Sequence, residues 1–142
     1  MPLVFALNCL IVSLVVVTHY EFLGWLGRLL KILRLRHRTR ILVGVFWALI
    51  AHALEVWIFA VAYYWMSHTD GWGSLTGATE GTLLDCAYFS FTVFTTLGFG
   101  DIGPVGNLRY LTGLEALSGM VLITWTASFL FMEMQRHWEN RH

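Results

Sequence analysis

The apolar positions of the chain form three long runs, which cover residues 2–19, 41–66 and 108–134. As helices, the two longer runs exceed the roughly 30 Å hydrocarbon core of a bilayer, and the first, about 27 Å long, just reaches across it. A fourth apolar run at 83–94 would be only about 18 Å long, which is too short to span. The pattern therefore predicts an all-α membrane protein with three spanning helices and one half-length helix.

The short apolar run stands between a polar segment and a glycine-rich one. Residues 67–82 are rich in Gly, Ser and Thr, and TLLD at 82–85 matches the capping-box pattern of a helix start. The run ends directly in TTLGFGD at 95–101. Bare backbone at membrane depth is tolerated only where it is buried in protein or lines water, so a half-length helix that stops at a glycine-rich strand predicts a pore.

Composition excludes an ordinary soluble domain. The 142 residues are 57% hydrophobic and 13% charged, whereas a soluble domain carries about 25% charged residues. No basic residue precedes the first apolar run, so we expect a membrane helix there rather than a secretory signal. Cys9 and Cys86 lie within apolar segments and are expected to be buried free thiols.

Basic residues are concentrated between the first two apolar runs, at Arg28, Lys31, Arg34, Arg36, Arg38 and Arg40. By the positive-inside rule, the segment 20–40 is cytoplasmic, the N-terminus lies outside and the tail at 135–142 lies inside. Residues 67–107 then face the outside, and their charged side chains are all acidic: Asp70, Glu80, Asp85 and Asp101. We expect a multi-pass protein of the cell (plasma or inner) membrane whose negative outer mouth concentrates cations.

The basic segment has a helical pattern of its own. One face of the predicted helix carries Arg28, Lys31, Arg34 and Arg38, and the opposite face carries Phe22, Leu26, Leu29 and Leu33. Basic side chains three residues apart are typical of a voltage sensor, but the preceding helix lacks acidic counter-charges. An amphipathic helix on the anionic inner leaflet is the simpler interpretation. Anionic lipid at the four basic residues is therefore the expected partner, and nucleic acid is not expected.

Within the glycine-rich strand, GFGDIG at 98–103 matches the G-x-G-x-x-G pattern of dinucleotide-binding turns. That pattern needs a strand before it and a helix that opens directly on it. Here an apolar run of helix length precedes Gly98, and Pro104 follows Gly103. The glycines are therefore assigned to a role other than nucleotide binding.

The same strand resembles the signature of tetrameric potassium channels, T-x-G-Y/F-G-D after a short pore helix. It stands here as Thr96-Leu97-Gly98-Phe99-Gly100-Asp101. The resemblance covers 41–134 and implies an outer helix at 41–66, a turret at 67–82, a pore helix at 83–94, a filter at 95–101 and an inner helix at 108–134. The N-terminal membrane helix at 1–19, the linker and the tail lie outside it. It also implies a homotetramer, since one chain supplies a quarter of each ring of filter carbonyls.

The chemistry of such a filter depends on the backbone. A bare cation in a narrow pore needs oxygen ligands in place of its hydration shell. Successive carbonyls face one axis only when the handedness of the backbone alternates, and glycine adopts positive φ at low cost. The resemblance implies K⁺ sites at the carbonyls of Thr96, Leu97, Gly98 and Phe99, with the Thr96 hydroxyl completing the innermost site and Gly100 continuing the alternation. No cofactor is expected besides bound K⁺.

Several positions depart from the commoner pattern of the family. In the filter, Leu97 replaces Val and Phe99 replaces Tyr. On the pore helix, Tyr88 and Phe89 stand where many relatives have a Trp pair, and Thr92 replaces a frequent Glu. The predicted filter support comprises Asp101, Tyr88, Phe89, Thr92 and Thr95. We expect a hydrogen bond from the Tyr88 hydroxyl to the Asp101 carboxylate, and apolar ring packing alone between Phe89 and Phe99.

The inner helix carries a candidate hinge and a candidate cavity lining. Gly119 matches the family's gating-hinge position, although a small residue also allows close helix packing. Both interpretations are open. By the same alignment, the residues that line the cavity are Met120, Ile123 and Ala127.

Three ionisable residues lie within the predicted spans: His52 and Glu55 on one face of the outer helix, and Glu115 on the inner helix. Ionisable groups are costly in a membrane and are often functional there. They form either a proton-sensitive brace beside the filter or protonated, hydrogen-bonded groups that hold helices together.

The expected function is potassium-selective conduction. Two alternatives remain: a poorly selective monovalent cation channel, and a non-conducting membrane subunit that modulates a partner. The intact filter motif favours conduction. No nucleophile–base pair or metal-ligand cluster is recognisable in a pocket-forming segment, so the chain is not expected to be an enzyme.

Overall fold

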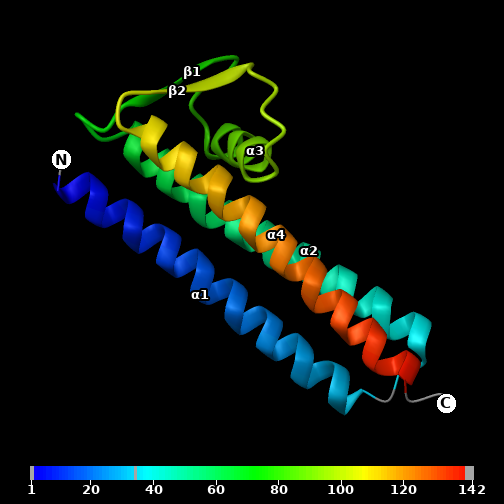
Figure 1. Ribbon diagram of the computed structural model, residues 1–142. Coiled ribbons are helices and arrows are strands. Elements are labelled where there is room, and N and C mark those ends of the chain that lie inside the picture. Colours follow the sequence, from blue (N-terminus) through cyan, green and yellow to red (C-terminus); the bar gives the residue numbers. More distant parts are fainter. Residues whose placement is uncertain (1, 34, 140–142) are drawn as a thin grey trace.

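A computed structural model describes residues 2–33 and 35–139 of the chain (Figure 1). The helices are α1 (Pro2–Ile32), α2 (His37–Ser67), α3 (Leu83–Phe94) and α4 (Leu108–Glu139), and the strands are β1 (Ser74–Gly77) and β2 (Ile102–Val105). α1, α2 and α4 each contain a segment long and apolar enough to cross a membrane. The predicted helical membrane fold is confirmed, with a short β-ribbon added to it.

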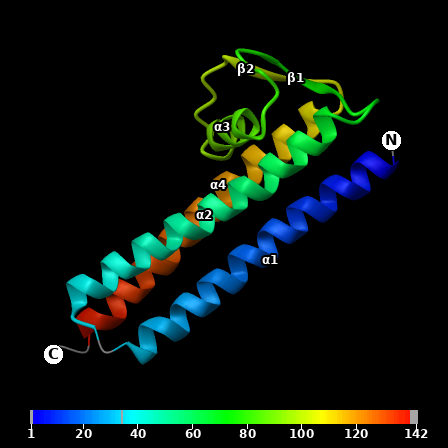
Figure 2. The same ribbon diagram turned by 180° about the vertical axis from the view of Figure 1, so that it is seen from behind.

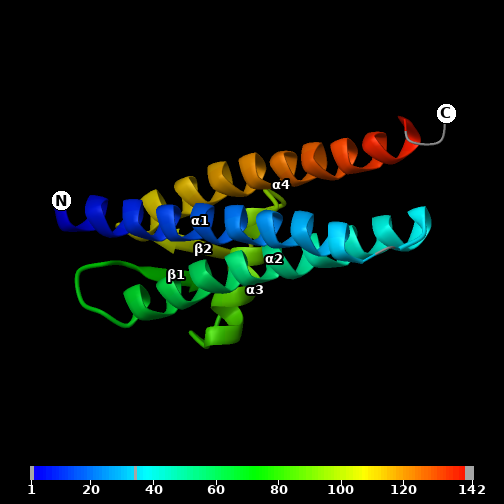
Figure 3. The ribbon, with the colours of Figure 1, turned by 90° about the horizontal axis from the view of Figure 1, so that it is seen from below.

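The long helices lie side by side, and α3 packs at one end of this bundle against α2 and α4 (Figures 1 and 2). α1 contacts both α2 and α4 and runs along the line between them when the bundle is seen from below (Figure 3). The start of α1 lies at the end that carries α3 and the strands. The connection from α1 to α2 and the end of α4 lie at the opposite end, so the basic segment and the acidic segment are at opposite ends of the molecule.

The first helix is longer than predicted. It does not end at residue 19 but continues to Ile32, about 46 Å in all at 1.5 Å per residue. The reason is a stripe of buried side chains that recurs every three or four residues beyond Val15, at His19, Leu23, Leu26 and Leu30. Each turn of this stripe packs against α2 or α4, which stabilises the helix past the point where its hydropathy falls.

The prediction of a separate amphipathic helix over residues 20–40 is therefore wrong. The chain leaves helical structure after Ile32 and enters α2 at His37. Arg28 and Lys31 belong to α1 and Arg38 belongs to α2, while Arg34 lies outside the described residues. Arg28 and Lys31 therefore lie on a different helix from Arg38, and the voltage-sensor interpretation loses the continuous helix that it requires.

The core lies behind α3. It brings together Phe59 and Tyr63 of α2, Phe94 of α3, and Leu108 and Leu111 of α4. Cys86 belongs to this core as predicted, whereas Cys9 is exposed on α1. The expectation for Cys9 is wrong because α1 packs on one side only, and the apolar residues of its other side are exposed as in a helix that faces lipid.

The β-ribbon ties the turret to the segment that follows the glycine-rich strand. β1 and β2 are antiparallel, with Ser74 opposite Val105 and Gly77 opposite Ile102. The Ala78 amide extends the ladder by donating to the Asp101 carbonyl at 2.8 Å. The end of the glycine-rich strand is thus fixed by main-chain hydrogen bonds from the turret.

At the opposite end, Arg40 joins the three long helices. Its guanidinium donates to the Glu133 carboxylate of α4 at 2.7 Å and to the Leu30 carbonyl of α1 at 2.8 Å. Both side chains of the ion pair are mostly buried. This contact holds the ends of α1 and α4 against the first turn of α2.

Candidate functional site

The short helix α3 begins with the predicted capping box. The Thr82 hydroxyl accepts from the Asp85 amide at 3.1 Å, and the Asp85 carboxylate accepts from the Thr82 amide at 3.1 Å and from the Glu80 amide at 3.0 Å. Hydrogen bonds from the Thr82 backbone, together with its neighbours, hold the pKa of Asp85 below its ordinary value. α3 has the bounds predicted for the pore helix, from 83 to 94.

Residues 95–101, predicted as a glycine-rich strand, follow α3 without β-strand structure but have the alternating backbone that the motif requires; we keep the name glycine-rich strand for this segment. Thr96, Gly98 and Gly100 have φ of 59°, 51° and 81°, and no residue between them has positive φ. Positive φ at the glycines was expected; at Thr96 it was not, because a β-branched residue rarely adopts it. The Gly98 amide donates to the Thr92 carbonyl at 3.0 Å, which returns the strand to the last turn of α3.

The side chains of this strand are not covered by their own chain. Leu97 is 61% exposed and Phe99 is 65% exposed. Leu97 and Phe99 alternate with the three positive-φ residues. In such an alternating backbone, the carbonyl groups face one side and the apolar side chains face another. A single chain leaves both surfaces open.

The predicted hydrogen bond between Tyr88 and Asp101 is present. The Tyr88 hydroxyl donates to the Asp101 carboxylate at 2.8 Å. The ring of Tyr88 is also nearly parallel to that of Phe99, with centroids 6.5 Å apart. This one side chain from α3 therefore contacts the strand at two positions.

Within the described part of the chain, the rings of Phe89 and Phe99 do not form the predicted contact. Phe89 is buried and packs edge-on against Tyr63 at 5.1 Å. Its side chain points toward α2 because successive residues on a helix point about 100° apart, so Tyr88 and Phe89 cannot both face the strand.

The two predicted threonines turn their hydroxyls back to their own helix. Thr92 donates to the Phe89 carbonyl at 2.8 Å, and Thr95 donates to the Phe91 carbonyl at 2.7 Å. Thr92 supports the strand through its main-chain carbonyl rather than through its side chain.

Glu115 lies behind α3 in what we call the hydroxyl cluster, formed by Glu115, Tyr63 and Ser90. Its fully buried carboxyl contacts the Tyr63 hydroxyl of α2 at 2.5 Å and the Ser90 hydroxyl of α3. Ser90 also lies 2.9 Å from the Val56 carbonyl, which can only accept. If Ser90 donates its single proton there, its contact with Glu115 needs a proton on the carboxyl. The geometry fits a protonated carboxyl that joins α2, α3 and α4.

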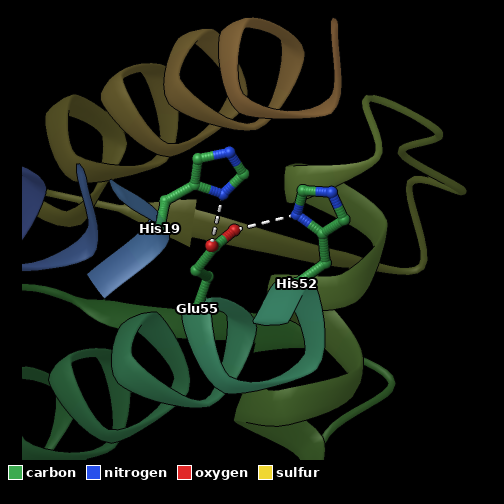
Figure 4. Close-up of side chains that lie close together, drawn as sticks. All are labelled: His19, His52 and Glu55. Carbon is green, nitrogen blue, oxygen red and sulfur yellow. Dashed lines mark hydrogen bonds and ion pairs between the residues drawn. The ribbon is translucent and has the colours of Figure 1, made fainter. Parts of the chain in front are cut away.

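His52 and Glu55 belong to a second group, which we call the histidine cluster: His19, His52, Glu55 and Thr126 (Figure 4). The Glu55 carboxylate contacts Nδ1 of His19 at 2.8 Å and Nδ1 of His52 at 2.9 Å. The Thr126 hydroxyl lies 3.4 Å from Nε2 of His19 and 3.1 Å from Nε2 of His52. The cluster therefore joins α1, α2 and α4.

His19 was missed by sequence reasoning, which treated it as the end of the first span. The signal was present in Glu55, because a buried carboxylate needs a partner and the outer helix offers only His52. Sequence reasoning also did not bring together three possible ligand residues: atoms of His19, His52 and Glu55 all lie within 4.8 Å of one another.

On α4, Gly119 packs against the end of α3 so closely that an added Cβ would overlap the Phe94 carbonyl. This contact supports the packing interpretation of Gly119, and its role as a hinge stays a prediction. Met120, Ile123 and Ala127, predicted to line a cavity, are all exposed on the single chain. Their place in a cavity therefore depends on other subunits.

Comparison with known proteins agrees with this arrangement. A search among curated proteins and one among solved structures gave no match. A family model described as ion channel matches residues 51–136, which is more than half of the chain. The match begins within α2 and ends within α4, and it includes α3, the glycine-rich strand and the hydroxyl cluster. The chain therefore belongs to this ion-channel family and is a multi-pass membrane protein.

Proposed function

We propose that the protein is a potassium-selective channel, in which four copies of the chain surround one filter formed by residues 95–101. The observation that carries the proposal is the alternating backbone at Thr96, Gly98 and Gly100, directly after a half-length helix. Alternation lets successive carbonyls face one axis and replace the hydration shell of K⁺. In this proposal, the ion ligands are the carbonyls of Thr96, Leu97, Gly98 and Phe99.

The exposure of the strand supports a tetramer. Leu97 and Phe99 are large apolar side chains that their own chain leaves open, and neighbouring copies would cover them. The carboxyl ends of four copies of α3 would then point toward the axis, each with about half a negative charge. Met120, Ile123 and Ala127 would line the cavity below.

The support of the filter differs from the common pattern of the family. Thr92 replaces a frequent Glu on the pore helix, yet a buried carboxyl still lies behind α3, because Glu115 of α4 contacts Ser90. We infer that Glu115 supplies the missing polar support from the inner helix. Tyr88 supplies the other support through Asp101.

Orientation and lipid partners follow from charge. We place the α1–α2 connection and the end of α4 in the cytoplasm, and the N-terminus and turret outside. Arg28 and Lys31 line a groove of about 460 Å³, together with Arg136 and the acidic Glu21 and Glu133. Its basic side chains outnumber its acidic ones, which suits an anionic lipid headgroup. The groove replaces the predicted continuous basic face as the proposed lipid site.

A poorly selective cation channel is the second candidate. Leu97 and Phe99 differ from the common filter sequence of the family, and fewer polar side chains support the proposed filter. A non-conducting modulatory subunit is less well supported, since the alternation is intact.

Matched glycine variants test the proposal. Purified protein in liposomes should conduct K⁺, and Gly98→Ala should abolish the flux because a Cβ opposes the required positive φ. Gly113→Ala is the control: it lies on α4, where an added Cβ meets nothing within 4 Å. The wild type should have about four times the 16.2 kDa chain mass. Unchanged selective flux in Gly98→Ala, or selective flux from a monomer, would overturn the proposal.

A further inference from the structure

We propose that His19, His52 and Glu55 form a binding site for one divalent transition-metal ion, with Zn²⁺ as the best fit, which ties α1 to α2 inside the membrane. The site is separate from the filter. Its test measures metal binding directly, so the proposal stands or falls independently of ion conduction.

The ligand set fits zinc. Two imidazoles and one carboxylate, provided by two helices, meet in one place: Nδ1 of each ring faces one oxygen of Glu55, and the ligand atoms lie within 4.8 Å of one another (Figure 4). Zn²⁺ is bound by such nitrogen and oxygen ligands at about 2.0–2.2 Å, commonly with a water in the fourth position. The ligand atoms of a tetrahedral site lie about 3.3 Å apart. The pairs at 2.8 and 2.9 Å therefore need to open by about half an ångström, while the two imidazole nitrogens, which lie within 4.8 Å of each other, need to reach the same spacing by side-chain rotation.

A second group orients both imidazoles. Metal-binding histidines use their other ring nitrogen for a hydrogen bond that fixes the tautomer and the ring orientation. Here Nε2 of His19 and Nε2 of His52 both face the Thr126 hydroxyl, at 3.4 and 3.1 Å. Thr126 is unusual among its neighbours, because Thr124 and Ser128 return their hydroxyls to the helix backbone. With Nδ1 of both rings directed to the metal, both Nε2–H groups would donate to Thr126.

Aromatic rings shield the cluster from solvent. Trp125 lies 5.1 Å from the ring of His19, and Phe94 lies 5.7 Å from the ring of His52. His19 and Glu55 are fully buried. A buried carboxylate without a compensating cation is costly, so this site needs a positive partner in every state.

Without metal, that partner is a proton. The four contacts of the cluster form a closed ring, and each contact needs one hydrogen atom. Ionised Glu55 supplies none and Thr126 supplies one, so the two imidazoles supply three and one of them is an imidazolium. The metal-free ring is then neutral. A metal ion would displace both Nδ1 protons: one leaves the cluster, and the other is made up at the Nε2 that had accepted from Thr126, so one proton is released for each ion bound.

Titration of Co²⁺ into the full-length protein in detergent, after removal of metal with a chelator, tests the site. Co²⁺ is the probe because four-coordinate Co²⁺ has visible d–d absorption bands. We expect bands that saturate at one ion per chain and disappear when Zn²⁺ displaces Co²⁺. His19→Gln and Glu55→Gln should abolish these bands, and Thr126→Val should weaken binding by about 10–100-fold.

The control is His68→Gln, which changes an exposed histidine outside the cluster and should leave the bands unchanged. The other histidines are His37, His137 and His142. Any Co²⁺ that they bind is the same in every variant, so the difference between wild type and variant reports the cluster alone. If a ligand variant does not fold, Thr126→Val keeps all three ligands and must still bind more weakly. Absence of the bands in the wild type means that the cluster holds a proton only, and this overturns the proposal. Bands that persist in His19→Gln and Glu55→Gln, or unchanged affinity in Thr126→Val, also overturn it.

Discussion

Glu55 and Glu115 are both fully buried within membrane-spanning helices, yet different chemistry surrounds them. Glu55 contacts two imidazoles, whereas Glu115 contacts two hydroxyls. An imidazole can carry a full positive charge near neutral pH, and a hydroxyl cannot. The comparison teaches that the partners set the charge state of a buried carboxyl: the contacts of Glu55 fit a carboxylate with a positive partner, and those of Glu115 fit a protonated carboxyl that both donates and accepts.

The two clusters also support different parts of the molecule. The hydroxyl cluster lies against α3 and therefore supports the helix that precedes the proposed filter. The histidine cluster attaches α1, which lies outside the matched family region of 51–136. A change in the first should alter conduction, and a change in the second should mainly alter how α1 is held.

Removal of Glu115 should have the largest effect on stability. In Glu115→Ala, Ser90 keeps its bond to the Val56 carbonyl. The buried Tyr63 hydroxyl, however, loses its shortest hydrogen bond, at a cost of about 1–3 kcal/mol, and the cavity left by the side chain adds to the loss. Thermal unfolding of the detergent-solubilised protein measures the loss, and K⁺ flux should fall with it. Wild-type stability in this variant would show that the hydroxyl cluster carries no structural role.

Glutamine at each position separates the two charge states. Glu115→Gln keeps a donor and an acceptor and should cost less than about 1 kcal/mol, whereas Glu55→Gln leaves an imidazolium unpaired and should cost about 1.5–3 kcal/mol. Unfolding of both variants under the same metal-free conditions gives the comparison. Equal losses, or a larger loss for Glu115→Gln, would contradict the assigned charge states.

Asp101 is an exposed carboxylate at the outer end of the proposed filter, in contrast to the two buried ones. Tyr88→Phe removes the hydrogen bond to Asp101, and because both groups are exposed on the single chain, the loss of stability should be smaller than for either buried carboxyl. We expect faster loss of current during sustained opening, with assembly unchanged. Phe91→Leu, on the same helix, is a control that leaves this bond intact. Identical inactivation in Tyr88→Phe and wild type would remove Asp101 from the filter support.

The smallest effect belongs to Asp85, whose side chain is partly exposed at the start of α3. Hydrogen bonds from the Thr82 backbone lower its pKa in the folded state. A lowered pKa adds stability that is present above the pKa of the unfolded chain, near 3.9, and is lost as pH falls through the folded value. Melting temperatures at pH 5 and pH 3 should therefore differ more in the wild type than in Asp85→Asn. The same difference in both proteins would show that the capping box does not titrate in this range.

Local signals predicted much of the pore region from the sequence. The Thr82–Asp85 capping box, the apolar run to Phe94 and the glycine spacing each depend on residues close together in the chain, and the structure has α3 and the alternating strand where they indicate. The Tyr88–Asp101 bond was also predictable, because the family signature places a donor on the pore helix opposite this carboxylate.

Tertiary contacts explain what the sequence did not predict. α1 continues past residue 19 because Leu23, Leu26 and Leu30 pack on other helices, and no local pattern reveals that packing. The β-ribbon pairs four-residue segments that are far apart in the chain. His19 lies 36 residues from its partner Glu55, so only the packing of α1 against α2 brings them together.

The most direct test of the central claim is a bi-ionic reversal potential from single channels in a planar bilayer, with K⁺ on one side and Na⁺ on the other. Intact alternation at Thr96, Gly98 and Gly100 predicts a reversal potential displaced strongly in the direction of K⁺ selectivity, which collapses to zero when K⁺ is present at equal concentration on both sides. A reversal potential near zero under bi-ionic conditions would contradict potassium selectivity and favour a poorly selective cation channel.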